Sequence, residues 1–344
     1  QMYETSIPIV ASVVGALDSV FADYRVYATD NFDLLVVARP SGTIAPPDYR
    51  LLDEPAVRSE LDRLGIAGRA DIALRLVGSK ALWSPMLAVR GVPKNSDYFP
   101  FVDQNAARYR FLSKLDALPL ADLGDYPVPV LEALQLRREP EPGPVGASTF
   151  FDNSDNAHVA QQIRDYLLEG RTSASLPVAF WSSLATIREG HDCERMAVAK
   201  ILALLDLSRR THPSLTSREI DAVWSGIGSA SPCNEPGTRV GRWVAFLHAL
   251  SMRDWPATAK RAGGILAAEG SELAGPPLEI LLLADLSARL ATNDREGFLR
   301  TAEDYPLSAV QDGRGAAPLL MELVLAQARN LGWRGPLVAD TAAR

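Results

Sequence analysis

The first part of the fold is decided by Tyr24–Ala38, which reads YRVYATDNFDLLVVA. Polar and apolar residues alternate over Tyr24–Thr29, which is the pattern of a half-buried β-strand. Asp30-Asn31 is a turn signal, because both side chains hydrogen-bond readily to nearby backbone. Leu34–Ala38 is a continuous apolar run, which is typical of a strand buried on both faces. The sequence therefore predicts a β-hairpin, of the kind that closes the edge of a doubly wound sheet.

Helices are predicted on either side of this hairpin. Ile9–Tyr24 carries apolar residues at helical spacing along one wide face. After a Pro- and Gly-rich loop, Glu54–Leu64 has the pattern of a short amphipathic helix. Asp71–Val77 and Ala81–Val89 each fit a helix or a strand; a helix is favoured for the first, and the second stays open. The first part of the chain is therefore expected to be a partial Rossmann-like sheet remnant, a β-hairpin with helices.

The rest of the chain has helical patterns and no alternation of period two. Arg137–Ser148, with three prolines and two glycines, is the clearest linker. The helices expected after it are His158–Leu168, Pro177–Glu189, Glu194–Leu207, Arg218–Ser225, Arg239–Ser251, Pro256–Ala268, Pro277–Thr292, Arg295–Tyr305 and Ala316–Asn330. These patterns predict an α+β protein with an α/β part at 1–136, a linker at 137–148 and an all-α domain at 149–335.

A weak internal repeat lies in the helical part. Leu250–Asp254 (LSMRD) and Leu290–Asp294 (LATND) each separate two predicted helices, and they are 40 residues apart. In both places a long helix ends, a short polar turn follows, and the next helix starts after an aspartate. Two stacked helical hairpins would give this echo, as in TPR-like solenoids, and so would an antiparallel bundle. A solenoid would offer a concave face to a protein partner.

Composition excludes some classes of function. The 344 residues suggest two or three domains, and the net charge of −7 argues against a nucleic-acid partner. No apolar run approaches the roughly 18–20 residues needed to cross a bilayer, and no signal peptide is visible, so no membrane contact is expected from this chain. Cys193 and Cys233 are its two cysteines, and neither belongs to a C-x-x-C motif. We therefore expect no disulfide framework and a reducing, cytoplasmic setting.

Familiar catalytic and metal-binding motifs are missing from the sequence. It has no Gly-rich phosphate loop, no G-x-S-x-G and no H-E-x-x-H. His191–Glu194 gathers four residues with ligand chemistry, but neighbours on a helix point in different directions, so Asp192 is better explained as a helix N-cap. Phe151–His158 is acidic but lacks the twelve-residue calcium-loop pattern. We therefore predict no metal site.

One segment remains as a candidate site, Lys94–Phe111, which reads KNSDYFPFVDQNAARYRF. Its first residues can form an Asx-type turn, which Tyr98, Phe99 and Phe101 would pack onto the domain. Asp103 would then cap a helix that starts at Gln104. This structural explanation is favoured by the residues alone. If the segment binds substrate, the candidate residues are Asn95, Asp97, Tyr98, Asp103 and Arg108.

Two stretches resemble a known family. Met2–Ala38 resembles the closing part of the catalytic domain of spermidine synthase-like proteins, polyamine aminopropyltransferases, where a helix leads to a strand and then to a final strand at the sheet edge. Asn95–Phe111 is similar to the N-[ST]-D-D/Y-x-P-x-x-[DE] segment that follows that domain in large bacterial members. The chain also begins inside what has the pattern of an α/β unit. We therefore expect it to be the C-terminal region of a longer protein.

The resemblance implies a parent enzyme that transfers an aminopropyl group from decarboxylated S-adenosylmethionine to an amine such as putrescine. The Gly-rich cofactor loop, the acidic ribose ligand and the catalytic aspartate of that family have no counterpart here, so no catalytic residue and no cofactor are assigned to this chain. Large members often carry N-terminal membrane helices, which implies a parent at the inner membrane. Two alternatives stay open: a helical-repeat interaction module without enzymatic activity, and an independent enzyme with a site between the two halves.

Overall fold

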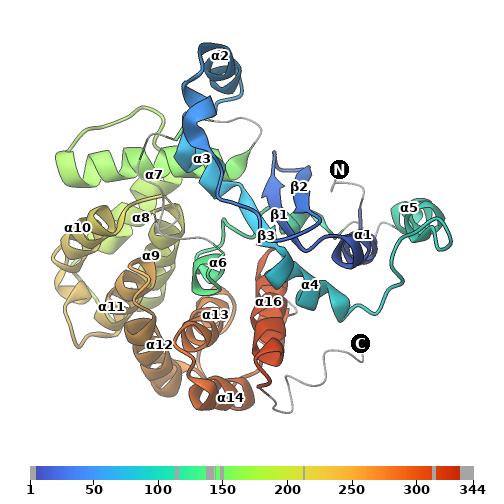
Figure 1. Ribbon diagram of the computed structural model, residues 1–344. Helices are drawn as coiled ribbons and strands as arrows, with labels where there is room; N and C mark the ends of the chain where they lie inside the picture. Colours follow the sequence, from blue (N-terminus) through green and yellow to red (C-terminus); the bar gives the residue numbers. More distant parts are fainter. Residues whose placement is uncertain are drawn as a thin grey trace.

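The computed structural model describes residues 5–112, 116–136, 143, 145–147, 151–211, 214–311 and 315–333 (Figure 1). Within these residues the chain forms sixteen α-helices and one three-stranded antiparallel sheet. The α+β class predicted from the sequence is therefore confirmed. The predicted linker at 137–148 lies mostly outside the described residues, and the domain boundaries stay a prediction.

The predicted hairpin is present and is preceded by a helix. Helix α1 (Ile7–Val20) leads into β1 (Asp23–Ala28), which pairs antiparallel with β2 (Leu34–Arg39). The Asp30 carboxylate closes the turn, because it accepts hydrogen bonds from the backbone N–H groups two and three residues later, at 2.7 and 2.8 Å. The turn signal in the sequence therefore acts as predicted.

A third strand was not predicted. The prediction of a helix over 71–77 is wrong at its end, because α3 (Arg69–Leu74) stops and β3 (Leu76–Ser79) follows. This strand pairs with the other side of β1, so the sheet order is β2-β1-β3. A side chain at Gly78 would have its Cβ 2.3 Å from the Trp83 indole nitrogen, so glycine lets α4 (Lys80–Ala88) fold back against the strand.

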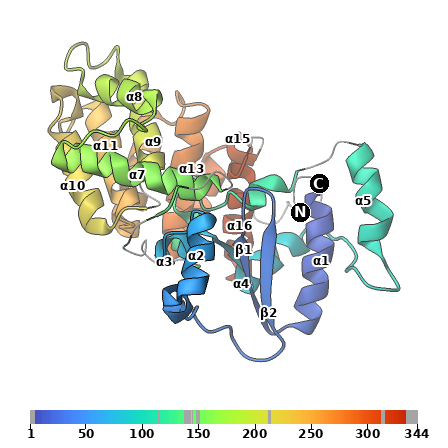
Figure 2. The same ribbon diagram turned by 90° about the horizontal axis from the view of Figure 1, so that it is seen from above.

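The prediction that the apolar second strand is buried on both faces is wrong. Leu35, Val36 and Val37 are 52%, 36% and 42% exposed, because β2 is an edge strand. In the described part of the chain, no strand pairs with its outer edge. Both views place α1 beyond β2, on the side away from β1 (Figures 1 and 2). The central strand β1 instead carries the alternating buried positions of the core.

The remaining elements of the first part are short. They are the 3-10 helices Tyr49–Asp53 and Leu118–Leu120, α2 (Pro55–Arg63), α5 (Phe101–Phe111) and α6 (Val130–Ala133). The helical half contains α7 (Asp152–Glu169), α8 (Val178–Arg188), α9 (Ala197–Thr211), α10 (Ser217–Gly228), a 3-10 turn at Pro232–Asn234, α11 (Arg239–Ser251), α12 (Trp255–Glu269), α13 (Pro276–Ala291), α14 (Arg295–Asp304), α15 (Ser308–Gln311) and α16 (Ala317–Asn330).

The helical half curves around α6 and returns to the sheet part (Figure 1). Helix α8 packs on α9, α11 packs on α9 and α12, and α13 packs on α12 and α14. Helix α16 then contacts both α13 and α4, while α13 also contacts α6. One hydrophobic core therefore runs from Ile7 in α1 to Trp333 after α16. The two halves are packed together rather than separated.

The repeated turn predicted in the helical half has one geometry in both copies. Arg253 and Asn293 are both left-handed, with φ of 58° and 57°. Asp254 and Asp294 then cap α12 and α14, each accepting a hydrogen bond from the backbone N–H three residues later, at 3.1 and 3.0 Å. The expected helix start after aspartate is therefore confirmed at both places.

The expectation of no disulfide is wrong. Cys193 and Cys233 form one, with Cα atoms 5.1 Å apart, because the segment after α8 lies against the 3-10 turn before α11. The last turn of α8 is held by Lys200, which is fully buried and donates to the carbonyl oxygens of Thr186 and Ile187 at 2.8 and 3.0 Å. Among the helices described, none is both long and apolar enough to span a bilayer.

Candidate functional site

The predicted site segment, residues 94–111, forms a turn tied to α1 and then α5. The Asn95 N–H donates to the Ser12 carbonyl of α1 at 3.1 Å, and the Asn95 carboxamide oxygen accepts from the Val102 N–H at 3.0 Å. The second bond satisfies an N–H group of the first helical turn that has no partner within the helix. Asn95 is thus a structural joint between the turn and the helix.

The helix begins earlier than predicted, which changes the role of Asp103. Helix α5 starts at Phe101, directly after Pro100, so Asp103 lies in its first turn and does not cap it. The turn before it is closed by Ser96, whose hydroxyl accepts from the Phe99 N–H at 3.1 Å. The prediction of Asp103 as the cap is therefore wrong, although a carboxylate near the helix N-terminus remains favourable.

The aromatic side chains of this segment do not pack the turn onto the domain as predicted. Tyr98 is 92% exposed and Phe99 is 67% exposed, while Phe101 is half-buried. No side chain of α5 is buried, and Phe111 at its end is 87% exposed. Helix α5 stands at the side of the molecule away from the helical half (Figures 1 and 2). The turn and α5 therefore expose three large aromatic side chains, Tyr98, Phe99 and Phe111.

The five candidate residues are not gathered in one enclosed site. Asp97, Tyr98, Asp103 and Arg108 are exposed and spread along the turn and α5, and Asn95 is half-buried. Asn95 borders a pocket of about 620 Å³ between α1 and the turn; its lining is Ala16, Ser19, Val20, Pro93, Lys94, Asn95, Ser96 and Phe99. The lining is mainly apolar, so the pocket suits an apolar group better than a charged one. A substrate role for these residues stays a prediction.

The other sequence candidates have structural explanations. His191 is exposed and lies 2.8 Å from the Glu189 carboxylate, and Cys193 is in the disulfide. Asp192 does not cap α9, which begins at Ala197; it is left-handed, with φ of 54°. In the part of the chain that the structure describes, no three His, Cys, Asp or Glu side chains are placed to hold a metal ion.

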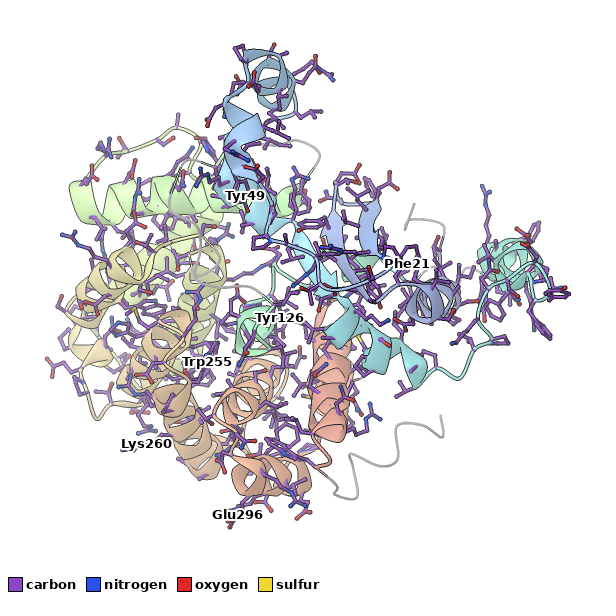
Figure 3. All side chains as sticks on the ribbon, viewed as in Figure 1. Phe21, Tyr49, Tyr126, Trp255, Lys260 and Glu296 are labelled. Carbon is purple, nitrogen blue, oxygen red and sulfur yellow. A yellow bond between two sulfur atoms is a disulfide. The ribbon has the colours of Figure 1, made fainter. Side chains whose placement is uncertain are left out.

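A polar cluster that the sequence did not reveal lies where the two halves meet. The Asp125 carboxylate accepts from the Asn156 amide of α7 at 3.0 Å and from the Arg209 guanidinium of α9 at 3.2 Å. Asp152 and Asn31 bond each other twice, at 2.8 and 2.9 Å, and so join the hairpin turn to α7. Tyr126, next in sequence to this cluster, lies at the centre of the molecule (Figure 3).

Burial perturbs the pKa of Asp125 and of the nearby Asp122 carboxylate. Burial, and then the charges of Asp125 and Asp152, raise the pKa of Asp122 to about 6. Burial also raises the pKa of Asp125, against the lowering effect of Arg209. A carboxyl group with such a pKa exchanges its proton near neutral pH. The members of the cluster come from distant parts of the chain, so no local motif could have pointed to it.

Comparison with known proteins adds no assignment. No family model, no curated protein and no solved structure matches this chain. Function must therefore be argued from the fold, the exposed surfaces and the resemblance in the sequence.

Proposed function

We propose that this chain is the C-terminal region of a spermidine synthase-like protein. The complete protein would transfer an aminopropyl group from decarboxylated S-adenosylmethionine to a polyamine. This chain would contribute the edge of a Rossmann-like sheet and a helical domain, and it would be non-catalytic by itself. The helix–hairpin order of α1, β1 and β2 supports the proposal, since it is the order that the resemblance implies.

The observation that carries this proposal is the open edge of β2. Edge strands are usually protected by charge, proline or a bulge, but residues 34–38 contain none of these. Helix α1 lies beyond this edge and leaves Val13 and Val20 39% and 65% exposed. An additional strand beside β2 would cover both sets of apolar side chains. A sheet that continues past β2 in the complete protein would suit this arrangement.

The direction of the strands fits this role. Both pairings of β1 are antiparallel, and the described residues contain no parallel pair. A doubly wound sheet is built mainly from parallel strands, with antiparallel strands at its edge. In the proposal, the parallel strands and the cofactor site belong to polypeptide that precedes this chain.

The test is complementation between two separately expressed pieces. The catalytic part of a spermidine synthase-like protein that carries the 95–111 motif is assayed for aminopropyl transfer to putrescine, with and without the matching C-terminal piece. We expect activity only with the piece, and weaker association after Val36→Lys on β2. The control is Val198→Lys on α9, which is 57% exposed and far from the sheet. Equal activity without the piece would refute the proposal.

The proposal and the disulfide imply different cellular locations. A spermidine synthase-like parent implies a cytoplasmic chain, with the parent held at the inner membrane by N-terminal helices. The Cys193–Cys233 bond opposes a cytoplasmic location, because disulfides are rare in reducing compartments. Alkylation of free thiols in protein taken directly from its native cells decides between these locations. Alkylated Cys193 and Cys233 would indicate a reducing compartment, and protected cysteines would indicate an oxidising one.

A second function, a helical-repeat interaction module, is favoured by the repeated turns at Arg253 and Asn293. A left-handed residue followed by an aspartate cap recurs at an offset of 40 residues, which is the kind of echo that stacked helical hairpins would give. Small-angle X-ray scattering tests this candidate. A closed bundle predicts a radius of gyration of about 20 Å for a chain of this length, and an open solenoid predicts a larger value.

A further inference from the structure

A second pocket lies beside the sheet, where β3 runs directly into α4. It has a volume of about 500 Å³, and its polar lining comes from Asp23, Arg25, Thr43, Ser79, Lys80 and Gln135. The apolar part of the lining belongs largely to α4 and to the turn after α6. The pocket is distinct from residues 94–111 and from the cluster around Asp122.

The Ser79 hydroxyl points to a ligand in this pocket. Ser79 is 6% exposed and lines the pocket, yet its side chain does not cap α4 and has no other hydrogen-bond partner among the described residues. Arg25 stands directly opposite Ser79 in the β1–β3 register, so both side chains project from the same face of the sheet. The Ser79 hydroxyl opens to the pocket, so a ligand atom there would take the place of water as its hydrogen-bond partner.

The electrostatics of the pocket favour an anion. Ser79 is the residue before the first turn of α4, and the N–H groups of that turn have no partner within the helix. Arg25 and Lys80 bring two positive charges and Asp23 one negative charge, which leaves one positive charge in excess. The Lys80 ammonium is already held by the carbonyl oxygens of Asp18 and Phe21, at 3.0 and 2.5 Å, so it contributes charge rather than contact.

Asp23 restricts the ligand further. One oxygen of its carboxylate accepts from the Ile44 N–H at 2.8 Å, and the other has no hydrogen bond to the described part of the chain. That oxygen would repel a bare anion but would accept a hydrogen bond from a hydroxyl group. A volume of about 500 Å³ also exceeds what a phosphate group alone fills. The pocket therefore suits an anion carried by a small hydroxylated molecule.

We propose that this pocket binds a hydroxylated phosphate monoester, with the phosphate at the N-terminus of α4. The Arg25 guanidinium and the Ser79 hydroxyl hold the phosphate oxygens, and Asp23 accepts from a hydroxyl group of the ligand. Binding requires no rearrangement of the sheet, because the register already sets Arg25 beside Ser79. This site does not depend on the function proposed above.

Isothermal titration calorimetry of the whole chain with glycerol 1-phosphate tests the proposal, at constant ionic strength set with chloride. We expect binding that is tighter than that of inorganic phosphate. Arg25→Gln should weaken it about tenfold or more, because a charge-assisted hydrogen bond is lost. Ser79→Ala should weaken it less. The control is Arg50→Gln, since Arg50 is exposed and contacts Asp48 instead.

Each result either supports or overturns the site. Absence of heat with both probes would overturn it, as would equal affinities for the original chain and Arg25→Gln. Inorganic phosphate binding as tightly as glycerol 1-phosphate would overturn the role of Asp23. Thermal unfolding shows whether each variant is folded. If Arg25→Gln does not fold, the single variants Arg25→Lys and Ser79→Ala are used in its place. Arg25→Lys should keep the charge and lose the forked contact, giving intermediate affinity.

Discussion

Replacing Asp122 by asparagine should stabilise the protein at neutral pH and not at acid pH. The pKa of Asp122 is raised from 3.8 to about 6 in the folded state, so the folded chain holds this proton more tightly than the unfolded chain. Between these two values the folded state binds more protons, and the free energy of unfolding therefore falls as pH rises. Above about pH 6 the stability contributed by the proton on Asp122 is lost completely.

The magnitude follows from the size of the shift. A change of about 2 pKa units at 1.36 kcal/mol per unit corresponds to about 3 kcal/mol. Asparagine cannot ionise but keeps the size and polarity of the side chain. Because Asp122 is partly accessible to solvent, the increase in the free energy of unfolding is smaller than the full shift implies. We therefore expect Asp122→Asn to raise the free energy of unfolding by about 2 kcal/mol at pH 7.5 and to leave it nearly unchanged at pH 4.

Urea denaturation at intervals between pH 4 and pH 8 measures this difference for both proteins. The control is Asp62→Asn, because Asp62 is an exposed carboxylate paired with Arg58 on α2. Asp125→Asn gives a second check: it removes one of the charges that raise the Asp122 pKa, so the pH dependence should move toward lower pH. Stability curves for Asp122→Asn and the original chain that run parallel over the whole pH range would refute the reasoning.

Four further predictions concern single contacts. Reducing the disulfide, which closes a loop of 40 residues, should lower the free energy of unfolding by about 4 kcal/mol, seen as a lower urea midpoint; an unchanged midpoint contradicts a structural bond. Lys200→Ala should cost about 3 kcal/mol in the same assay, because buried carbonyl oxygens lose their donor. Asp254→Ala and Asp294→Ala should each lower the free energy of unfolding by about 1 kcal/mol, because each removes a helix cap. Asp294→Ala should lower it further, because Asp294 also binds Arg289 at 2.6 Å. Equal losses for the two variants would show that this ion pair has no net effect on stability. Asp97→Ala in a full-length spermidine synthase-like protein should lower turnover without changing its melting temperature, whereas unchanged turnover leaves Asp97 a structural role only.

Features set by neighbours in sequence could be predicted from the sequence. The hairpin was found because alternation and an Asp-Asn turn act over a few residues. The starts of α12 and α14 were found because Asp254 and Asp294 cap helices through local backbone N–H groups. Strand β3 was missed because four residues are too few to show alternation, and its Gly78 has meaning only against Trp83.

Features that depend on distant partners could not be predicted. An apolar run such as that in β2 indicates that the strand favours burial, but it does not show whether a neighbouring element buries it. The exposure of Tyr98 and Phe99 is missed for the same reason. The pKa of Asp122 depends on Asp152, thirty residues away, and the phosphate pocket pairs Arg25 with Ser79 across two strands. No local pattern marks such contacts.

The open edge of β2 also has a consequence for the behaviour of the chain in solution. Residues 34–38 are uncharged and mostly valine or leucine, and their outer backbone groups pair with no strand in the described part of the chain, so they are a template for adding strands from other molecules. At high concentration the chain alone should therefore form sheet-rich aggregates, which thioflavin fluorescence detects. A lysine at position 36 would act as a gatekeeper and delay them. Self-association of this kind would reflect an uncovered edge and not a native oligomer.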